Sequence, residues 1–354
     1  MSINSSRLFQ PTAGVQQLAD ALRPALGMAA RQQELSASTL RLALDHRVAP
    51  LLHHAQQLAG YECEPEIAAR LAHEAQGNVH RILRQKAAAM TFGRLLDDAG
   101  IGFRLVKGYD VGRLLYGTES LRVAKDVDVL LAPDQIGRAL TIARDAGYRR
   151  PGGKRLSAAV GRAILMFHRE MEIVDPRTGI VLELHSRLLD RPPPGWDDRQ
   201  FLSGPLDLTS PDHVLYLILH GAAGQWRRLK WMADLAMIAR RTPADVRSRV
   251  ITLARKYDCL PAVHASLLAC GVLWEDELVR DWLAETGLSE TDERVSRHLR
   301  EYTRTLDRDT QPDSRQLAAR RLELEREEPV FGTAHPSRPW AMGKRAALWF
   351  LRRL

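Results

Sequence analysis

The stretch that decides the fold is Lys125-Asp126-Val127-Asp128-Val129-Leu130-Leu131. Its run of valine and leucine predicts a strand, which the following Ala132-Pro133 ends. Residues two apart in a strand project from the same face, so both aspartates point one way and both valines point into the opposite layer. Two neighbouring carboxylates repel each other, and each raises the other's pKa unless a cation neutralises them. Oxygen ligands of this kind point to Mg²⁺ or Mn²⁺.

A third carboxylate lies in the apolar run Val181-Leu182-Glu183-Leu184-His185. Glu183 shares a strand face with His185 there, whereas the two leucines face the other layer. If this strand lies beside the first one, Glu183 joins the two aspartates. The three carboxylates would then form the cluster that a two-metal phosphoryl-transfer or nucleotidyl-transfer site requires.

Positive charge precedes the two aspartates. The short β-prone run 101–106 ends at Lys107-Gly108, where glycine allows a close backbone approach to a phosphate and lysine supplies a charge. Arg122 lies on the turn just before the aspartates, and its guanidinium can form two parallel hydrogen bonds to a triphosphate. Lys107, Gly108 and Arg122 are therefore candidate nucleotide-binding residues.

The composition is that of a folded protein with a basic bias. Of the 354 residues, 45% are hydrophobic and 27% are charged, which excludes a disordered tail and a collagen-like fibre. Lys and Arg number 51 against 43 Asp and Glu, and the net charge of +8 favours polyanionic partners such as nucleotides, nucleic acid or anionic lipid. No P-loop and no serine nucleophile elbow occur, which argues against an ordinary P-loop ATPase and a serine hydrolase.

The expected compartment is the cytoplasm. The three cysteines form no Cys-x-x-Cys pair, so neither a disulfide framework nor a zinc knuckle is indicated. The first ten residues lack the apolar core of a signal peptide, and no window is apolar enough to be a transmembrane segment.

Helical patterns dominate before the strands. Residues 15–99 have the pattern of helices and show no strand pattern, with apolar residues at three- and four-residue spacing in Val79, Leu83, Ala87 and Met90. Asp98-Ala99-Gly100 ends this region, because Gly100 can take the left-handed conformation that closes a helix.

The rest of the chain continues the alternation. Residues 109–116 predict a short helix, and Asp134 is the expected cap of a helix that runs to about residue 146. The β-prone runs 167–174 and 180–185 flank a turn sequence typical of a hairpin.

The C-terminal part is again helical. After the linker at residues 192–195, Ser210-Pro211 begins a region that is helical almost to the end. The tail, residues 338–354, combines aromatic and basic residues. We expect it to dock on the body as a last helix rather than to bind a membrane surface or an anion.

Seven motifs follow one another in an order and at a spacing known from one family. They are Leu105-Val106-Lys107-Gly108, Leu114-Leu115-Tyr116, Leu121-Arg122, the 125–131 stretch from Asp126, Gly147-Tyr148, Leu182-Glu183-Leu184-His185 and Trp231-Met232-Ala233-Asp234-Leu235. In these motifs the chain resembles the nucleotidyltransferases of the DNA polymerase beta-like superfamily. Within it, the chain is similar to an uncharacterised branch often called nucleotidyltransferase family proteins. The resemblance extends from about His46 to about Ile238.

The resemblance implies a small mixed sheet with helical flanks and a reaction on a nucleoside triphosphate. In that reaction Mg²⁺ ions hold the triphosphate, an acceptor oxygen attacks the α-phosphorus and pyrophosphate leaves. By this resemblance Asp126 and Asp128 would be metal ligands, and Glu183 would be the third acid and would also draw the proton from the acceptor. Lys107, Gly108 and Arg122 would bind the triphosphate.

The chain departs from the superfamily pattern at the turn. Tyr109 follows Gly108 where serine or glycine is usual, and the gap from Gly108 to Asp126 is longer than typical. Ser186 stands where the branch often has tryptophan. These departures concern how the triphosphate is held more than whether a metal binds.

Three further residues keep alternative interpretations. His185 either orients Glu183 or contacts the nucleotide, or it is a hydrogen-bonded structural residue at a strand end. Asp234 is either a helix-packing partner for Arg227 or Lys230, or an active-site acid. Trp231, at helical spacing, is expected in the core rather than as a platform for a base.

The predicted architecture is helix-rich α+β in three parts: an N-terminal helical region at 1–95, a nucleotidyltransferase core with a small mixed sheet at 96–195, and a C-terminal helical region at 196–354. The predicted activity moves a nucleoside monophosphate from a nucleoside triphosphate to a hydroxyl or phosphate of a peptide, a protein, a small molecule or a tRNA. Two alternatives remain: a basic helical module that binds nucleic acid without catalysis, and a degenerate family member that binds nucleotide without turnover. Oligomeric state does not follow from the sequence.

Overall fold

A four-stranded mixed sheet lies at the centre of the chain. The computed structural model describes residues 7–190 and 192–306, and the strand order of this sheet is β3-β4-β6-β5. β3 (Phe103–Leu105) is antiparallel to β4 (Val127–Leu131), and β4 is parallel to β6 (Val181–His185). β5 (Glu170–Val174) pairs antiparallel with β6. The small mixed sheet and the hairpin that the sequence predicts are therefore confirmed.

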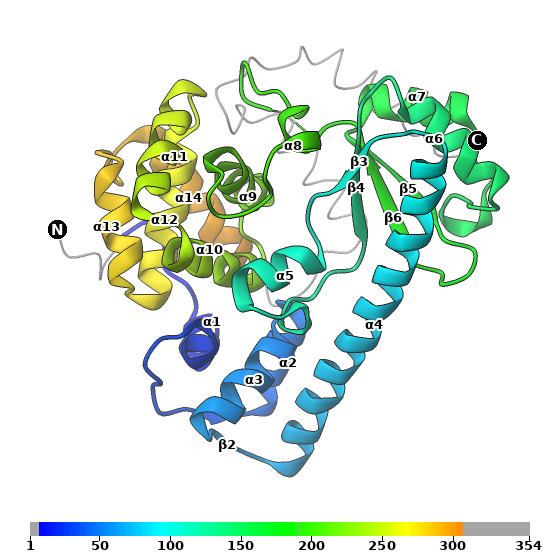
Figure 1. The fold of residues 1–354 in the computed structure, drawn as a ribbon. Helices are drawn as coiled ribbons and strands as arrows, with labels where there is room; N and C mark the ends of the chain where they lie inside the picture. Colours follow the sequence, from blue (N-terminus) through cyan, green and yellow to red (C-terminus); the bar gives the residue numbers. More distant parts are fainter. Residues whose placement is uncertain (1–6, 191, 307–354) are drawn as a thin grey trace.

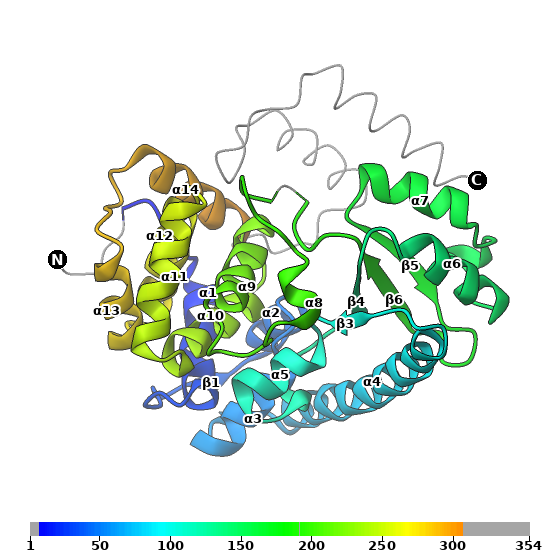
Figure 2. The ribbon, with the colours of Figure 1, turned by 45° about the horizontal axis from the view of Figure 1, so that its top comes forward.

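One face of the sheet is covered by three helices, α4 (Pro65–Asp98), α6 (Ile136–Asp145) and α7 (Ala158–Phe167), as Figures 1 and 2 show. Val127 and Val129 of β4 and Leu184 of β6 are buried on this side with Phe92 of α4. The predicted alternation along both strands is thus confirmed. Since side chains alternate along a strand, Asp128 and Glu183 lie on the opposite face, toward the C-terminal helices.

Helix α4 connects the N-terminal helices to the sheet. It contains 34 residues, which corresponds to a length of roughly 50 Å. Its first turns bury Ile67 and Leu71 with the helical regions, and its last turns bury Ala88 and Leu96 under the sheet. Because one helix contributes to both cores, the domain boundaries at 95/96 and 195/196 stay predictions.

The apolar spacing in α4 does not mark its buried face. Val79, Leu83 and Met90 are 40%, 60% and 59% exposed. The face that packs inward carries the polar residues Asn78 and Gln85, which are 1% and 0% exposed. Both bind backbone carbonyls of the segment that leads into β4, so the helix is oriented by hydrogen bonds where the sequence pattern suggests an apolar stripe.

The N-terminal region consists of short helices that pack on α4. It also contains two strands of two residues each, which pair in parallel, so the expectation of no strand in residues 15–99 is wrong. The elements are α1 (Ala13–Leu22), η1 (Arg23–Leu26), β1 (Glu34–Leu35), α2 (Ala37–Asp45), α3 (Ala49–Ala59) and β2 (Glu62–Cys63).

The C-terminal region is a helical body that shares one apolar core with the N-terminal helices. Helix α12 is buried along almost its whole length, which places it at the centre of this body. The elements are α8 (Gln200–Ser203), α9 (Pro211–Ala223), α10 (Leu229–Arg241), α11 (Ala244–Lys256), α12 (Leu260–Trp274), α13 (Glu277–Glu285) and α14 (Glu293–Leu306).

The predictions of where helices begin and end were partly correct. The Ser210 side chain accepts a hydrogen bond from the His213 amide and caps α9, as predicted, and Gly100 is left-handed after α4. The expected cap by Asp134 is wrong, because α6 begins after Gln135 with no side-chain cap and Asp134 accepts a hydrogen bond from the Gln135 side chain instead.

The remaining elements connect the strands. α5 (Tyr109–Tyr116) confirms the helix expected there, and η2 (Glu119–Leu121) and η3 (Pro151–Gly153) are short 3-10 turns. The expected docking of the tail at 338–354 lies outside the described residues. Among the described residues, no helix combines the length and the apolar character that crossing a bilayer requires.

His213 makes the fold sensitive to acid. Its Nδ1 lies 3.1 Å from the Asp207 carbonyl oxygen, whereas its Nε2 is buried without a hydrogen-bond partner. Burial lowers the pKa of His213 to about 4. Below pH 6.5 the unfolded chain therefore binds a proton that the folded chain does not take up until about pH 4, so the free energy of unfolding falls as the pH drops through this window.

We expect His213 to contribute about 3 kcal/mol to the loss of stability between pH 7 and pH 4. The variant His213→Asn keeps an amide donor for the Asp207 carbonyl but does not titrate. Urea unfolding of both proteins across this range measures the difference. Parallel pH profiles of the two proteins would contradict the assignment.

Candidate active site

The in-register pairing of β4 with β6 brings two carboxylates together. Asp128 lies directly opposite Glu183 in the parallel ladder. Donor atoms of Asp128, Glu183 and His185 all lie within 4.8 Å of one another. The predicted convergence of acidic side chains from two distant segments is therefore present in the structure for Asp128 and Glu183.

Lys107 and His185 surround Asp128. The Lys107 Nζ lies 2.7 Å and the His185 Nε2 2.9 Å from the same carboxylate oxygen, and Asp128 is only 5% exposed. Burial alone would raise the pKa of Asp128, but the Lys107 ammonium and the hydrogen bond from His185 outweigh it and hold this pKa well below its ordinary value. Asp128 is consequently a buried, ionised carboxylate.

Glu183 has the opposite electrostatic state. Burial and the nearby carboxylates of Asp126, Asp128 and Glu170 raise its pKa to about 7, although a hydrogen bond with His185 opposes the shift. Two acids on neighbouring strands therefore differ in protonation. The fully ionised one pairs with lysine, and the other exchanges a proton near neutral pH.

His185 connects the two acids. Its ring is fully buried, and its Nε2 lies 2.9 Å from Asp128 and 3.4 Å from Glu183. Its Nδ1 lies 3.7 Å from the Glu170 carboxylate, which Arg169 binds at 2.9 Å. Burial would lower the pKa of His185, but the bonds to Asp128 and Glu183 raise it above its ordinary value. This placement supports the orienting role for His185, and its contact with a nucleotide stays a prediction.

Asp126 lies at the rim of the site. It directly precedes β4, is partly exposed, and is not in the group of donors that Asp128, Glu183 and His185 form. Its charge nevertheless contributes to the raised pKa of Glu183, so the two carboxyl groups are electrostatic neighbours.

The Lys107-Gly108 turn has a backbone that requires glycine. Gly108 has φ +74° and ψ −133°, which a side chain would make unfavourable, and it precedes α5. Its carbonyl oxygen accepts a hydrogen bond of 2.8 Å from Arg122 Nη1. The turn is therefore held in place by one of the residues predicted to bind phosphate.

Arg122 forms a buried ion pair. Its Nε donates to Asp234 of α10 at 2.9 Å, and the Tyr116 hydroxyl donates to the other carboxylate oxygen at 3.0 Å. Burial alone would lower the pKa of Arg122, but the Asp234 charge raises it above its ordinary value. Asp234 thus packs the C-terminal helices against the core, as one expected interpretation had it, although the partner is Arg122 rather than Arg227 or Lys230.

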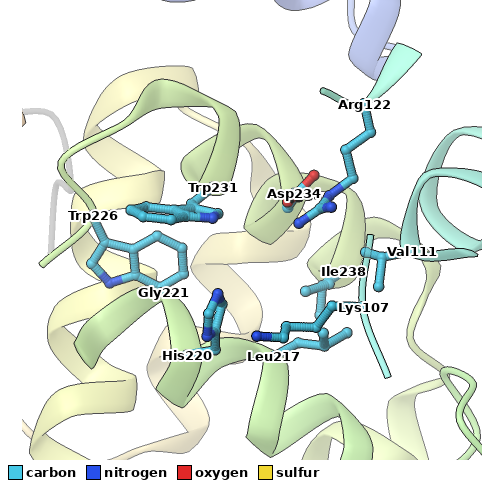
Figure 3. A pocket seen from close by; sticks show the side chains of 10 residues that line it. All are labelled: Lys107, Val111, Arg122, Leu217, His220, Gly221, Trp226, Trp231, Asp234 and Ile238. Atoms are coloured by element: carbon cyan, nitrogen blue, oxygen red, sulfur yellow. Dashed lines mark hydrogen bonds and ion pairs between the residues drawn. The ribbon is translucent and has the colours of Figure 1, made fainter. Parts of the chain in front are cut away.

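Lys107, Arg122 and side chains of helices α9 and α10 line a small cavity (Figure 3). Its volume of about 20 Å³ is enough for one water molecule and too small for a nucleobase. Lys107 and His220 point toward each other across it (Figure 3). Burial, together with the Lys107 and Arg169 charges, lowers the pKa of His220 well below its ordinary value. His220 is therefore a neutral neighbour of the lysine.

Several residues of the site had no signal in a local motif. Glu170 is the first residue of β5 and Arg169 directly precedes it, and Glu170 lies opposite His185 in the hairpin register. Extending the hairpin register backwards from the predicted turn would have placed Glu170 opposite His185. Gln85 donates to the carbonyl oxygens of Ala124 and Asp126, at 3.2 and 3.4 Å, and nothing in the sequence of α4 points to that contact.

The model of one protein family, described as uncharacterised nucleotidyltransferase, matches residues 35–275, more than two thirds of the chain. The chain belongs to this family. No curated protein and no solved structure shows a significant match. The membership confirms the resemblance found in the sequence and makes a transferase that acts on a nucleotide the general class of this protein.

The Arg122–Asp234 pair gives a prediction for stability. Asp234→Ala would leave a buried guanidinium without its counter-ion, and we expect the free energy of unfolding to fall by about 3–5 kcal/mol. Asp245→Ala is the matched control, because it breaks an exposed pair with Arg249 at 3.0 Å and should cost at most about 1 kcal/mol. Chemical denaturation measures both. Equal losses in the two variants would show that the buried pair has no special structural role.

Proposed function

We propose that this protein is a Mg²⁺- or Mn²⁺-dependent nucleotidyltransferase. It would transfer a nucleoside monophosphate from a nucleoside triphosphate to a hydroxyl or phosphate oxygen of an acceptor. The observation that supports this most is the in-register placement of Asp128 and Glu183 on parallel strands, in a chain of the nucleotidyltransferase family.

The residues present suit a divalent cation. The carboxylates of Asp126, Asp128 and Glu183 supply oxygen donors, which Mg²⁺ and Mn²⁺ prefer. Burial and, after it, the charges of the neighbouring carboxylates raise the pKa of Glu183, and a bound cation would relieve the repulsion between these carboxylates. Such a cation would polarise the phosphate oxygens and neutralise charge that develops on them.

The chain's own residues would orient the reactants and move one proton. The acceptor oxygen forms a bond to the α-phosphorus, the bond from the α-phosphorus to the bridging oxygen breaks, and pyrophosphate leaves with that electron pair. The proton of the acceptor hydroxyl would pass to the Glu183 carboxylate, whose pKa is about 7 in the protein without a cation.

The triphosphate would bind near the Lys107-Gly108 turn, which Arg122 holds in place. Lys107 keeps Asp128 ionised and brings a fixed positive charge to the site. Arg122 holds the Gly108 carbonyl, so the Lys107-Gly108 turn keeps one conformation when phosphate oxygens approach it. His185 would orient the Asp128 and Glu183 carboxyl groups rather than change them chemically.

A reducing, cytoplasmic location is part of the same proposal. Cys63, Cys259 and Cys270 are all free thiols, and the last two are buried. Free, unpaired cysteines are typical of proteins in a reducing compartment.

The central experiment measures Mg²⁺-dependent pyrophosphate release from each nucleoside triphosphate in the presence of cell lysate. Labelled nucleotide then shows whether the protein, RNA or small-molecule fraction acquires the label. We expect Glu183→Gln to lower the rate about 100- to 10,000-fold, the range for loss of a general base. Asp126 is a partly exposed candidate metal ligand, so Asp126→Asn should abolish metal-dependent pyrophosphate release and leave the melting temperature of the protein unchanged.

Asp134→Asn is the matched control for these variants. Asp134 is an exposed acid after the other end of β4, and its removal should leave pyrophosphate release unchanged. Full activity in Asp126→Asn and Glu183→Gln would refute catalysis at this site. It would favour either the noncatalytic nucleic-acid-binding module or the degenerate nucleotide-binding member.

A further inference from the structure

A group of basic side chains lies beside Asp126, outside the carboxylate site. We call Arg47, Arg81, Lys125 and Arg228 the basic cluster. They come from four separate parts of the chain: the turn between α2 and α3, helix α4, the segment before β4, and the loop between α9 and α10. All four side chains are partly or fully exposed, so they can reach a ligand in solvent.

Two hydrogen bonds hold the turn between α2 and α3 against the loop between α9 and α10. The Arg228 guanidinium donates to the Asp45 carbonyl oxygen, and the Leu229 amide donates to His46 Nδ1 at 3.1 Å. These bonds fix the turn that carries Arg47 against the loop that carries Arg228.

A second set of bonds fixes the segment before β4. Lys230 Nζ donates to the Val123 carbonyl oxygen at 2.8 Å, and Gln85 Nε2 donates to the Ala124 carbonyl oxygen at 3.2 Å. Arg81 lies one turn before Gln85 on the same face of α4. The four charges are therefore brought together by anchored backbone.

The cluster lacks counter-ions within the protein. Among the residues that the structure describes, none of the four forms an ion pair with a carboxylate; Arg81 instead donates to the Asn78 side chain. The positive charges disfavour one another. Arg47 is the largest cause that lowers the pKa of Lys125, and burial followed by the Arg47 and Arg227 charges lowers the pKa of Arg228 to about 10.

Within the described part of the chain, two carboxylates partly oppose these charges. Burial lowers the pKa of Arg47 and of Arg228, and Asp126 and Asp45 respectively counter that lowering in part. Like charges gathered in this way cost free energy in the unbound protein, and an anionic ligand would recover it.

A nucleoside triphosphate carries roughly four negative charges, and divalent cations at the carboxylates would offset part of them as well as the charges of Asp126, Asp128 and Glu183. Lys107 and Arg122 stand nearer to that site and are already bound to Asp128 and Asp234. The basic cluster comes from four separate segments, and the spread of its charges fits an extended anion beside the nucleotide.

An aromatic side chain lies beside the loop that carries Arg228. Trp231 follows Arg228 on α10, is half-buried, and lies 5.4 Å from the Arg227 guanidinium and 5.7 Å from Lys230 Nζ, measured to the ring centroid. Cations beside an aromatic ring are typical of surfaces that bind single-stranded nucleic acid, where charge follows the backbone and rings receive bases. An acidic peptide would use the charges but not the ring.

We propose that the basic cluster binds the phosphodiester backbone of a single-stranded nucleic acid and that this strand is the acceptor, presenting its terminal hydroxyl at Asp126 and Glu183. The acceptor role depends on the proposed function, whereas the binding does not. Of the acceptors that the sequence leaves open, the structure thus favours an RNA end.

The test compares two double variants in binding of a fluorescein-labelled 12-nucleotide single-stranded RNA. Arg81→Gln/Lys125→Gln removes two charges from the cluster. Arg280→Gln/Arg300→Gln removes two exposed charges from α13 and α14 and is the matched control. Fluorescence anisotropy over a NaCl series gives the slope of log K against log salt concentration for the full-length protein and both variants.

Each phosphate contact to a single strand contributes about 0.7 to this slope. We therefore expect the cluster variant to lose about 1.4 from the slope and about 25-fold in affinity at 0.1 M salt, whereas the control matches the unchanged protein. In labelled-nucleotide transfer to the same RNA, the cluster variant should raise KM for RNA and leave kcat unchanged.

Three results would overturn the proposal. The first is an equal loss of RNA affinity in the cluster and control variants, which would mean that only net charge matters. The second is a loss of affinity for a fluorescent nucleoside triphosphate in the cluster variant while its RNA binding persists. The third is competition by polyglutamate that is as strong per charge as competition by unlabelled RNA. If instead RNA binding depends on the cluster but no variant of Asp126 or Glu183 affects pyrophosphate release, the binding site stands and only the proposed catalysis fails.

Discussion

Asp128 and Glu183 on adjacent parallel strands are the constraint on which the site depends, because two carboxyl groups in a largely buried sheet face are unfavourable without compensation. The structure compensates them unequally. Lys107 and His185 both bind one oxygen of Asp128, and Glu183 is left with a raised pKa. The same arrangement that keeps the site stable in the absence of ligand also creates one permanent anion and one group that exchanges a proton.

The segment between α5 and β4 carries Arg122 and Asp126, and helices α4 and α10 hold it. Asn78 and Gln85 of α4 donate to its carbonyls from one side, and Lys230 and Asp234 of α10 bind it from the other. Because these partners are buried, the segment has a defined path without regular secondary structure. It places Arg122 against Gly108 and leaves Lys125 and Asp126 at the surface, between the carboxylate site and the basic cluster.

This arrangement explains why the polar face of α4 was missed. Val79, Leu83 and Met90 have helical spacing and are hydrophobic, and yet they are exposed, whereas Asn78 and Gln85 are buried because they donate to carbonyl oxygens of the segment that packs on α4. Periodicity reports where apolar residues lie on a helix, but it does not report what the neighbouring chain presents. The choice of Asp234's partner failed for a similar reason, because Arg122 is distant in sequence and Arg227 and Lys230 are near.

The sequence by itself determined what backbone geometry controls locally. The alternation in 125–131 and 181–185 separated the acids from the valines and leucines, the turn between β5 and β6 indicated their hairpin, and the Lys107-Gly108 pair marked the turn after β3. Only the tertiary structure decided that β6 lies beside β4, which cations accompany each acid, and that four remote segments place their basic side chains together. These outcomes depend on burying whole faces and on balancing charges across the chain, and neither is encoded in the spacing of neighbouring residues.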